Sequence, residues 1–264
     1  MRSILNIKKK LLKFEILLII ALIIFFALTK ISTLDYGLPF FEQEDENAFL
    51  KSTISFISFV TNIKPVLVDP TIAPLLNLLL SLKLIFINEY LINSLSISEI
   101  KNLIYYDPSI LIYYGRIISL AITSLSFYFL YLIFKKLKIN FFVSFILLIS
   151  LSLSLFSLTL SLVNGKNSYY FLFFVIQLYF FLKYYLKLEK FNKKSYLILS
   201  FLASLAWGTN YWSAIVSFYG VVILHYKKFG FKFFGNLLIF LISFTILGFL
   251  PTLTTNSFFL NFFF

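Results

Sequence analysis

Long apolar runs separated by short polar stretches follow one another along almost the whole chain. The runs cover 14–31, 70–92, 110–134, 141–163, 169–186, 196–207, 211–226 and 237–256. Several of them exceed the roughly 18 apolar residues that are typical of a membrane-spanning helix. The pattern therefore predicts an all-α fold, a polytopic membrane helix bundle.

The lysine and arginine residues indicate which of these runs cross the bilayer. If every run crossed, the basic clusters at 135–138 and 187–194 would lie on the side opposite to the N-terminal lysines. If 70–92 does not cross, one side holds 16 basic and 2 acidic residues, and the other holds 7 basic and 9 acidic residues. Basic residues accumulate in cytoplasmic loops. We therefore expect about seven spans with a cytoplasmic N-terminus.

The N-terminal run has a second interpretation, because basic residues precede it as they do in a cleavable signal peptide. The run ends in Ala27-Leu28-Thr29-Lys30, which contains no small-x-small cleavage site. An uncleaved first span is therefore favoured. The whole of 1–264 is then expected to be a single transmembrane domain.

This topology makes 32–109 a large acidic external loop. Two apolar segments in the loop, near 46–62 and 70–92, are expected to form juxtamembrane surface helices. The first has helically spaced apolar residues and begins at Asp45-Glu46, where negative charge suits a helix N-terminus. In the second, Pro74 and Lys83 disfavour a span.

Composition excludes several kinds of chemistry. Hydrophobic residues make up 60% of the chain and the mean hydropathy is +0.93, whereas a soluble domain is about 45–50% apolar. The chain has no cysteine and only one histidine, His225, which excludes disulfides, thiolate chemistry and a histidine-rich metal site. The net charge of +12 lies in short clusters between apolar runs, so it indicates membrane topology and not a nucleic-acid partner.

An acidic cluster, Glu42-Gln43-Glu44-Asp45-Glu46, opens the first surface helix. Four carboxylates in five positions repel one another, so the pKa of at least one should be raised. A carboxylate held at the membrane surface can act as a general base toward an acceptor hydroxyl. The alternative is an ordinary solvated acidic loop.

The order of these features resembles the GT-C superfamily of membrane glycosyltransferases, which includes the protein O-mannosyltransferases and the lipid A aminoarabinose transferases. In those enzymes an Asp-Glu pair opens a surface helix after the first span, a second surface helix follows a proline, and an Arg-x-x-Ser span ends in basic residues. The matching features here are Asp45-Glu46, the segment from Pro65 to Pro74, and Arg116-Ile117-Ile118-Ser119 running to Lys135-Lys136. The stretch 199–211 is similar to the small-residue-rich span of that superfamily.

The resemblance implies inverting transfer of a sugar from a polyprenyl-phosphate donor to a lipid, glycan or protein acceptor on the extracytoplasmic face. Asp45 would be the general base, and Glu46 its neighbour in the acceptor or metal site. Arg116 and Lys166 would face the donor phosphate, because a cation stabilises the charge of the leaving group. Weaker candidates for acceptor or sugar contacts are Glu44, Tyr211 and Trp212.

Each of these side chains also has a structural interpretation. Arg116 could extend to the lipid headgroups, and Lys166 could be a simple loop charge in Asn164–Ser168. The pair Tyr211-Trp212 is typical of an interfacial aromatic belt. No cofactor is certain from the pattern. A divalent metal is a further alternative, although Asn164–Ser168 lacks the acidic residue that many members of the GT-C superfamily have in that loop.

Two alternatives from other functional classes stay open. Members of the GT-C superfamily continue through further spans to a soluble domain, so this chain is expected to be truncated or minimal. A truncated or minimal chain would fit the first alternative, a non-catalytic membrane subunit. A transporter or flippase of a lipid-linked sugar intermediate would place paired charges deep in the spans, whereas Arg116 and Lys183 lie near span ends. The expected location is the bacterial inner membrane, with membrane lipids as partners.

Overall fold

The computed structural model describes residues 2–31, 34, 72–107, 109–154, 157, 160, 166–207, 209 and 214–253. Within these ranges the side chains of 2–13, 72–75, 78, 166, 189 and 248–253 are not described. The described residues lie in helices, turns and short connections, with no β-strand among them. The expectation of an all-α fold is therefore confirmed.

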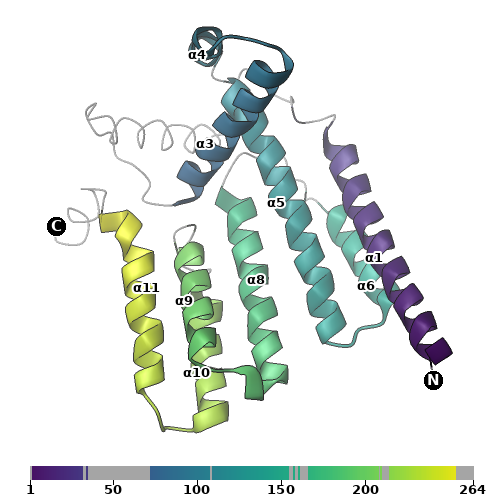
Figure 1. The fold of residues 1–264 in the computed structure, drawn as a ribbon, viewed down its shortest axis with the longest axis vertical. Helices are drawn as coiled ribbons and strands as arrows, with labels where there is room; N and C mark the ends of the chain where they lie inside the picture. The colour runs from purple at the N-terminus through teal and green to yellow at the C-terminus, as the bar shows by residue number, and fades with distance from the viewer. Residues whose placement is uncertain are drawn as a thin grey trace.

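The long helices stand side by side, and consecutive ones run in opposite directions (Figure 1). The smaller helices α3, η1 and α4 lie across the end of the bundle opposite to the N-terminus. In chain order the elements are α1 (Arg2–Ile31), α3 (Ile72–Ile85), the π-helix η1 (Phe86–Ile92), α4 (Ile97–Tyr106), α5 (Ser109–Lys136), α6 (Phe141–Ser152), α8 (Lys166–Leu186), the 3-10 helix η2 (Leu188–Lys190), α9 (Lys193–Trp207), α10 (Ile215–Phe229) and α11 (Gly235–Leu253).

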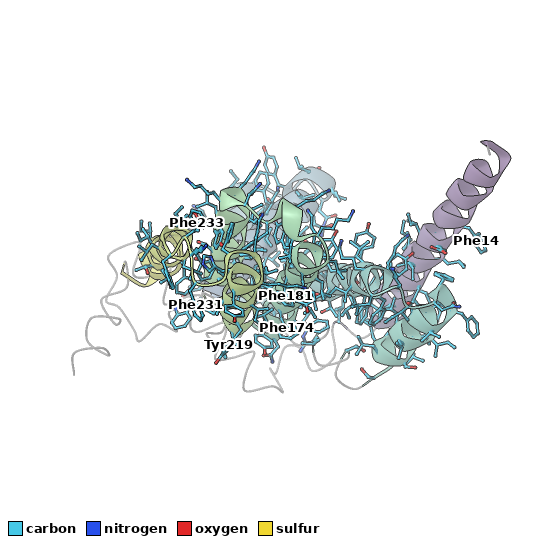
Figure 2. All side chains as sticks on the ribbon, turned by 90° about the horizontal axis from the view of Figure 1, so that it is seen from below. Phe14, Phe174, Phe181, Tyr219, Phe231 and Phe233 are labelled. Carbon is cyan, nitrogen blue, oxygen red and sulfur yellow. The ribbon has the colours of Figure 1, made fainter. Side chains whose placement is uncertain are left out.

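Three of the described helices contain a segment long and apolar enough to cross a membrane: Phe14–Ile31, Ser109–Lys136 and Asn167–Leu186. Shorter apolar segments occupy Phe141–Ser152 and Gly235–Leu247. Large apolar side chains cover the outside of the bundle; Figure 2 shows Phe174 and Tyr219 projecting outward, and Tyr219 is 67% exposed. These features are those of a membrane protein, whose outer surface contacts lipid instead of water.

One end of the bundle, where α5, α8 and α10 finish, carries most of the described lysines. The last turn of each of these helices is basic, where a positive charge also suits the helix dipole. The positive charges of Lys183, Lys187 and Lys190 act on Lys136, and Lys228 donates a hydrogen bond to the Phe191 carbonyl. We call this end, which holds Lys136, Lys183, Lys187, Lys190 and Lys228, the lysine end, and the end that holds α3, η1 and α4 the far end.

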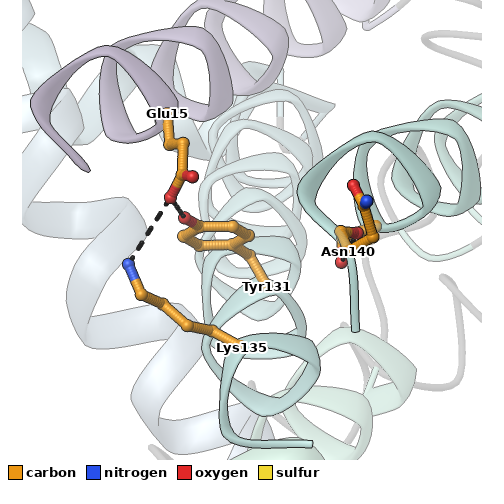
Figure 3. A network of polar contacts seen from close by, with 5 residues as sticks. Glu15, Tyr131, Lys135 and Asn140 are labelled. Atoms are coloured by element: carbon orange, nitrogen blue, oxygen red, sulfur yellow. Dashed lines mark hydrogen bonds and ion pairs between the residues drawn. The ribbon is translucent and has the colours of Figure 1, made fainter. Parts of the chain in front are cut away.

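A small polar network joins α1 to α5 near the lysine end (Figure 3). The Tyr131 hydroxyl donates to Glu15 Oε2 over 3.3 Å, and Lys135 Nζ lies 3.7 Å from the same oxygen. Nearby, Asn140 is the N-cap of α6, and its Oδ1 accepts a hydrogen bond from the backbone N–H of Phe142 at 2.9 Å. Glu15 therefore sits on the same side of the bundle as the lysines, as the charge count predicted.

The run 141–163 does not form one continuous helix, and the expectation of a single helical span there is corrected. Helix α6 ends at Ser152, and Leu153 is its C-cap. The Ser154 hydroxyl donates to the Leu151 carbonyl at 2.6 Å, and the Ser157 hydroxyl donates to the Ser152 carbonyl at 2.6 Å. Serine hydroxyls that bind backbone carbonyls compete with the helical hydrogen-bond ladder, which explains the break.

The second predicted segment is helical, since α3 and η1 together cover Ile72–Ile92; its place at the membrane surface stays a prediction. Pro74 lies in the first turn of α3, where its missing N–H costs nothing, so it does not break the helix. Helix α4 was not predicted. It begins with a capping box in which the Ser96 hydroxyl accepts the Glu99 N–H and the Glu99 carboxylate accepts the Ser96 N–H.

Close packing between α8 and α10 depends on Gly220. A Cβ atom at this position would lie 2.9 Å from Cδ2 of Phe181. We expect Gly220→Leu to destabilise the bundle by about 1–3 kcal/mol, because the ring and the helix behind it would have to move. Chemical unfolding in detergent micelles measures the change. Gly235→Leu is the matched control, since no atom lies within 4 Å of a Cβ built there; equal losses for both variants would contradict this interpretation.

Candidate functional site

Arg116 is a buried cation near the far end of the bundle. It lies about two turns into α5 and is only 4% exposed. Its Nη1 donates to the backbone carbonyl of Leu34 at 2.8 Å, and Leu34 itself is 1% exposed. Arg116 therefore does not extend to the lipid headgroups, and that interpretation of it is wrong.

The Arg116 side chain ties α5 to the point where the chain leaves α1. Helix α1 ends at Ile31, and the Leu34 N–H donates to the Ile31 carbonyl at 3.2 Å to form a turn. A buried guanidinium is tolerated when its donors are satisfied, because an uncompensated buried charge costs several kcal/mol. The contact holds Leu34 beside the positive charge of Arg116. In the sequence, Leu34 precedes the acidic cluster that begins at Glu42.

A stripe of hydroxyl residues continues from Arg116 along the same face of α5. Ser119, Thr123 and Ser126 follow at helical spacing, and each is completely buried. The Thr123 hydroxyl donates to the Ser119 carbonyl at 2.8 Å and also lies 3.3 Å from the Leu160 carbonyl. Among the described residues the Ser119 hydroxyl has no hydrogen-bond partner. The stripe gives an apolar span a polar interior face.

A second polar contact joins α3 to α8 at this end. The Tyr169 hydroxyl donates to Asn77 Oδ1 at 3.0 Å, and both residues are 3% exposed. Tyr169 also packs against Ile118 of α5, two residues beyond Arg116. The contact therefore fixes α3 and the first turn of α8 close to the Arg116 region of α5.

We expect Tyr169→Phe to destabilise the bundle by about 0.5–1.5 kcal/mol, because the buried Asn77 amide loses a partner that water cannot replace. Thermal unfolding of the purified chain measures the effect. Tyr170→Phe changes the neighbouring, half-buried tyrosine in the same way and should have little effect. A larger loss for Tyr170→Phe than for Tyr169→Phe would refute the importance of the Asn77 contact.

Glu89 is a carboxylate at the far end that the sequence reasoning missed. It lies in η1, where Oε1 accepts the Asn88 amide at 2.8 Å and the Tyr114 hydroxyl at 3.3 Å, while Oε2 accepts the Asn93 amide at 2.9 Å. The hydrogen bonds from Asn93 and then Asn88 hold the pKa of Glu89 below its usual value. Glu89 therefore stays ionised at neutral pH and attaches the π-helix to α5.

The sequence contained a signal for this feature, although a weak one. Asn88, Glu89 and Asn93 interrupt an otherwise apolar segment at helical spacing. A π-helix itself has no simple sequence signature, and such turns occur frequently at functional sites.

Lys166 is the first residue of α8, so the expectation that it belongs to a loop is corrected. Its side chain is not described, but its backbone lies one turn before Tyr169 and therefore at the same end as Arg116. The other predicted site residues all lie outside the described part of the chain; these are Glu44, Asp45, Glu46, Tyr211 and Trp212.

An apolar groove separates α1 from the end of α6. It is lined by Leu18, Ala21, Leu22 and Phe25 of α1 and by Phe145, Ile149, Ser152 and Leu153, and its volume is about 300 Å³. Its single polar lining residue, Ser152, donates its hydroxyl to the Ile149 carbonyl at 2.8 Å. The groove therefore offers a hydrocarbon surface and no free hydrogen-bonding group.

In the described part of the chain, no three carboxylate or histidine side chains come together in a way that would hold a metal ion. Comparison with known proteins identifies no relative: no protein-family model, no curated protein and no solved structure matches the chain.

Proposed function

We propose that the chain is a seven-span membrane glycosyltransferase of GT-C type, which moves a sugar from a polyprenyl-phosphate donor to an acceptor on the extracytoplasmic face. The observation that supports this most strongly is the buried guanidinium of Arg116, held beside Leu34 at the far end of the bundle. Charged side chains buried within membrane spans are costly and rare, and those that occur usually have a function.

In this proposal α1, α5, α6, α8, α9, α10 and α11 are the seven spans, and the lysine end faces the cytoplasm. Lysines from several basic clusters lie together at the lysine end. Since basic residues accumulate in cytoplasmic loops, this supports the orientation. Helices α6, α9 and α10 are shorter than the roughly 20 residues of a full span. To cross the bilayer, each of these helices must be extended by non-helical backbone. Such backbone is tolerated inside the bilayer where the protein buries it.

The proposed chemistry uses two opposite charges, a carboxylate and a guanidinium. Asp45 takes the proton of an acceptor hydroxyl, and the oxygen then attacks the anomeric carbon of the donor sugar. The bond between that carbon and the phosphate oxygen breaks, and polyprenyl phosphate leaves with the bonding electron pair. Arg116, with Lys166 at the same end of the bundle on α8, stabilises the negative charge that develops on the phosphate.

The groove between α1 and α6 supports the lipid part of the proposed donor. It is apolar, and α1 connects it to Leu34, the residue that Arg116 holds. From Leu22 to the end of α1 is about 14 Å along the helix axis at 1.5 Å per residue. A phosphate near Arg116 and an isoprenoid chain descending along α1 would both be accommodated.

The buried hydroxyl stripe below Arg116 favours one other function, a flippase of lipid-linked sugars. Ser119, Thr123 and Ser126 give α5 a polar face within the span, and polar residues inside spans are typical of transport pathways. The experiment must therefore distinguish cleavage of the donor from its movement.

The test uses the full chain purified into liposomes that contain a polyprenyl-phosphate sugar labelled in the sugar. The proposal expects release of polyprenyl phosphate and transfer of the label to an added acceptor, both measured by mass spectrometry. Movement of intact donor between leaflets without cleavage would instead establish the flippase. If neither occurs with any donor tested, the chain is a non-catalytic membrane subunit and the proposal is wrong.

A further inference from the structure

A group of lysines at the lysine end converges from separate parts of the chain. Lys136 finishes α5, Lys183 lies in the last turn of α8, and Lys187 and Lys190 follow in the connection to α9. These lysines are close enough for the charges of Lys183, Lys187 and Lys190 to act on Lys136. The fold therefore concentrates positive charge between α5 and α8, which are packed against each other.

The position of this group relative to the bilayer follows from the helices that carry it. Two of the three segments able to cross a membrane end here, Ser109–Lys136 and Asn167–Leu186. Lys136 Nζ lies 4.9 Å from the ring centre of Tyr179, and Lys183 Nζ lies 5.1 Å from that of Phe180. Tyrosine rings, and lysines whose ammonium groups extend to the headgroups, are typical of the ends of membrane spans.

Little negative charge is available to neutralise these lysines from within the protein. Among the carboxylates whose side chains the structure describes, Glu15 alone lies at this end, and it pairs with Lys135 outside the group. The sequence adds Glu189 between Lys187 and Lys190, which offsets one of the four charges. A net positive charge that lies between two spans at headgroup level is complementary to a phosphodiester.

We propose that Lys136, Lys183, Lys187 and Lys190 form a binding site for the headgroup of an anionic phospholipid, seated between the ends of α5 and α8. Basic pockets between spans bind anionic headgroups in this way, and each lysine near the surface contributes about a five-fold increase in affinity. The site is independent of any catalytic activity at the far end.

The test compares two double variants that remove the same charge from the same end of the full chain. Lys136→Gln with Lys183→Gln removes one lysine from each span, whereas Lys193→Gln with Lys194→Gln removes two exposed lysines at the start of α9. Each protein is placed in nanodiscs of phosphatidylcholine containing a minority of phosphatidylglycerol. Native mass spectrometry then counts the phosphatidylglycerol that stays bound.

The unmodified chain should retain phosphatidylglycerol in preference to phosphatidylcholine. The Lys136/Lys183 variant should lose about thirty-fold in that preference, and the Lys193/Lys194 variant should keep it. Lys136→Arg with Lys183→Arg should preserve binding, which separates loss of charge from loss of folding. Inorganic phosphate at millimolar concentration should not displace the lipid.

Three results would overturn the proposal. If the unmodified chain shows no preference for phosphatidylglycerol, the site does not exist, whether or not the variants fold. Equal losses in the two double variants would indicate unspecific attraction to a charged surface. Displacement by inorganic phosphate would identify a site for free anions instead of a lipid.

Discussion

Replacing Arg116 with glutamine is expected to lower the rate of sugar transfer by about 100- to 1000-fold. This is the loss observed when one preorganised donor to a developing negative charge is removed in a water-poor site. Glutamine removes the charge but keeps a polar side chain at the position whose Nη1 donates to the Leu34 carbonyl. The measurement is the initial rate of polyprenyl-phosphate release from the purified variant in liposomes.

Two controls give this prediction a clear meaning. Arg116→Lys keeps the charge but loses the planar donor geometry, so it should have intermediate activity. Lys101→Gln removes an exposed positive charge on α4 at the same end and should leave the rate within about two-fold, as expected when a distant exposed charge is screened. Full activity in Arg116→Gln would remove Arg116 from the phosphate site.

Replacing Asp45 with asparagine is expected to lower transfer by about 100- to 10,000-fold, the contribution of a general base. Asparagine has nearly the same shape and cannot accept the proton of the acceptor hydroxyl. Asp45 lies outside the described residues, so the prediction comes from the sequence pattern and from the position of Leu34 at the start of the same stretch. The rate is measured with the same liposomes and donor.

Glu42→Asn and Glu46→Gln show whether Asp45 alone is the base or whether the acidic cluster acts as a whole. If Asp45 is the base, Glu42→Asn should retain most of the activity and Glu46→Gln should lower it less than Asp45→Asn does. Similar small losses at all three positions would mean that the cluster acts only through its summed charge. Unchanged turnover in Asp45→Asn would contradict its catalytic role.

The helical architecture could be predicted from the sequence because the apolar runs leave few alternatives in a membrane. Runs such as 110–134 and 169–186 lie within α5 and α8, since a backbone surrounded by lipid must satisfy its own hydrogen bonds. Lys136 and the lysines Lys183, Lys187 and Lys190, which come from separate basic clusters, also lie together at one end of the bundle, an arrangement that the charge distribution favours.

Apolar periodicity alone did not predict three features of the fold. Apolar periodicity gives no information about where serine hydroxyls will compete with the backbone, so the end of α6 at Ser152 was missed. Helix α4 was overlooked although Ser96 and Glu99 have capping-box spacing. The burial of Arg116 depends on Leu34, a contact between residues distant in the sequence.

In the proposed orientation the lysine end and the far end, where Arg116 lies, face opposite sides of a membrane. Because the chain has no cysteine, single cysteines at Ser98 and Lys194, both exposed, can be labelled in intact cells with a membrane-impermeant maleimide. We expect labelling at Ser98→Cys in intact cells and at Lys194→Cys only after the membrane is opened. Labelling of both in intact cells, or of Lys194→Cys alone, would mean that the two ends do not have this orientation.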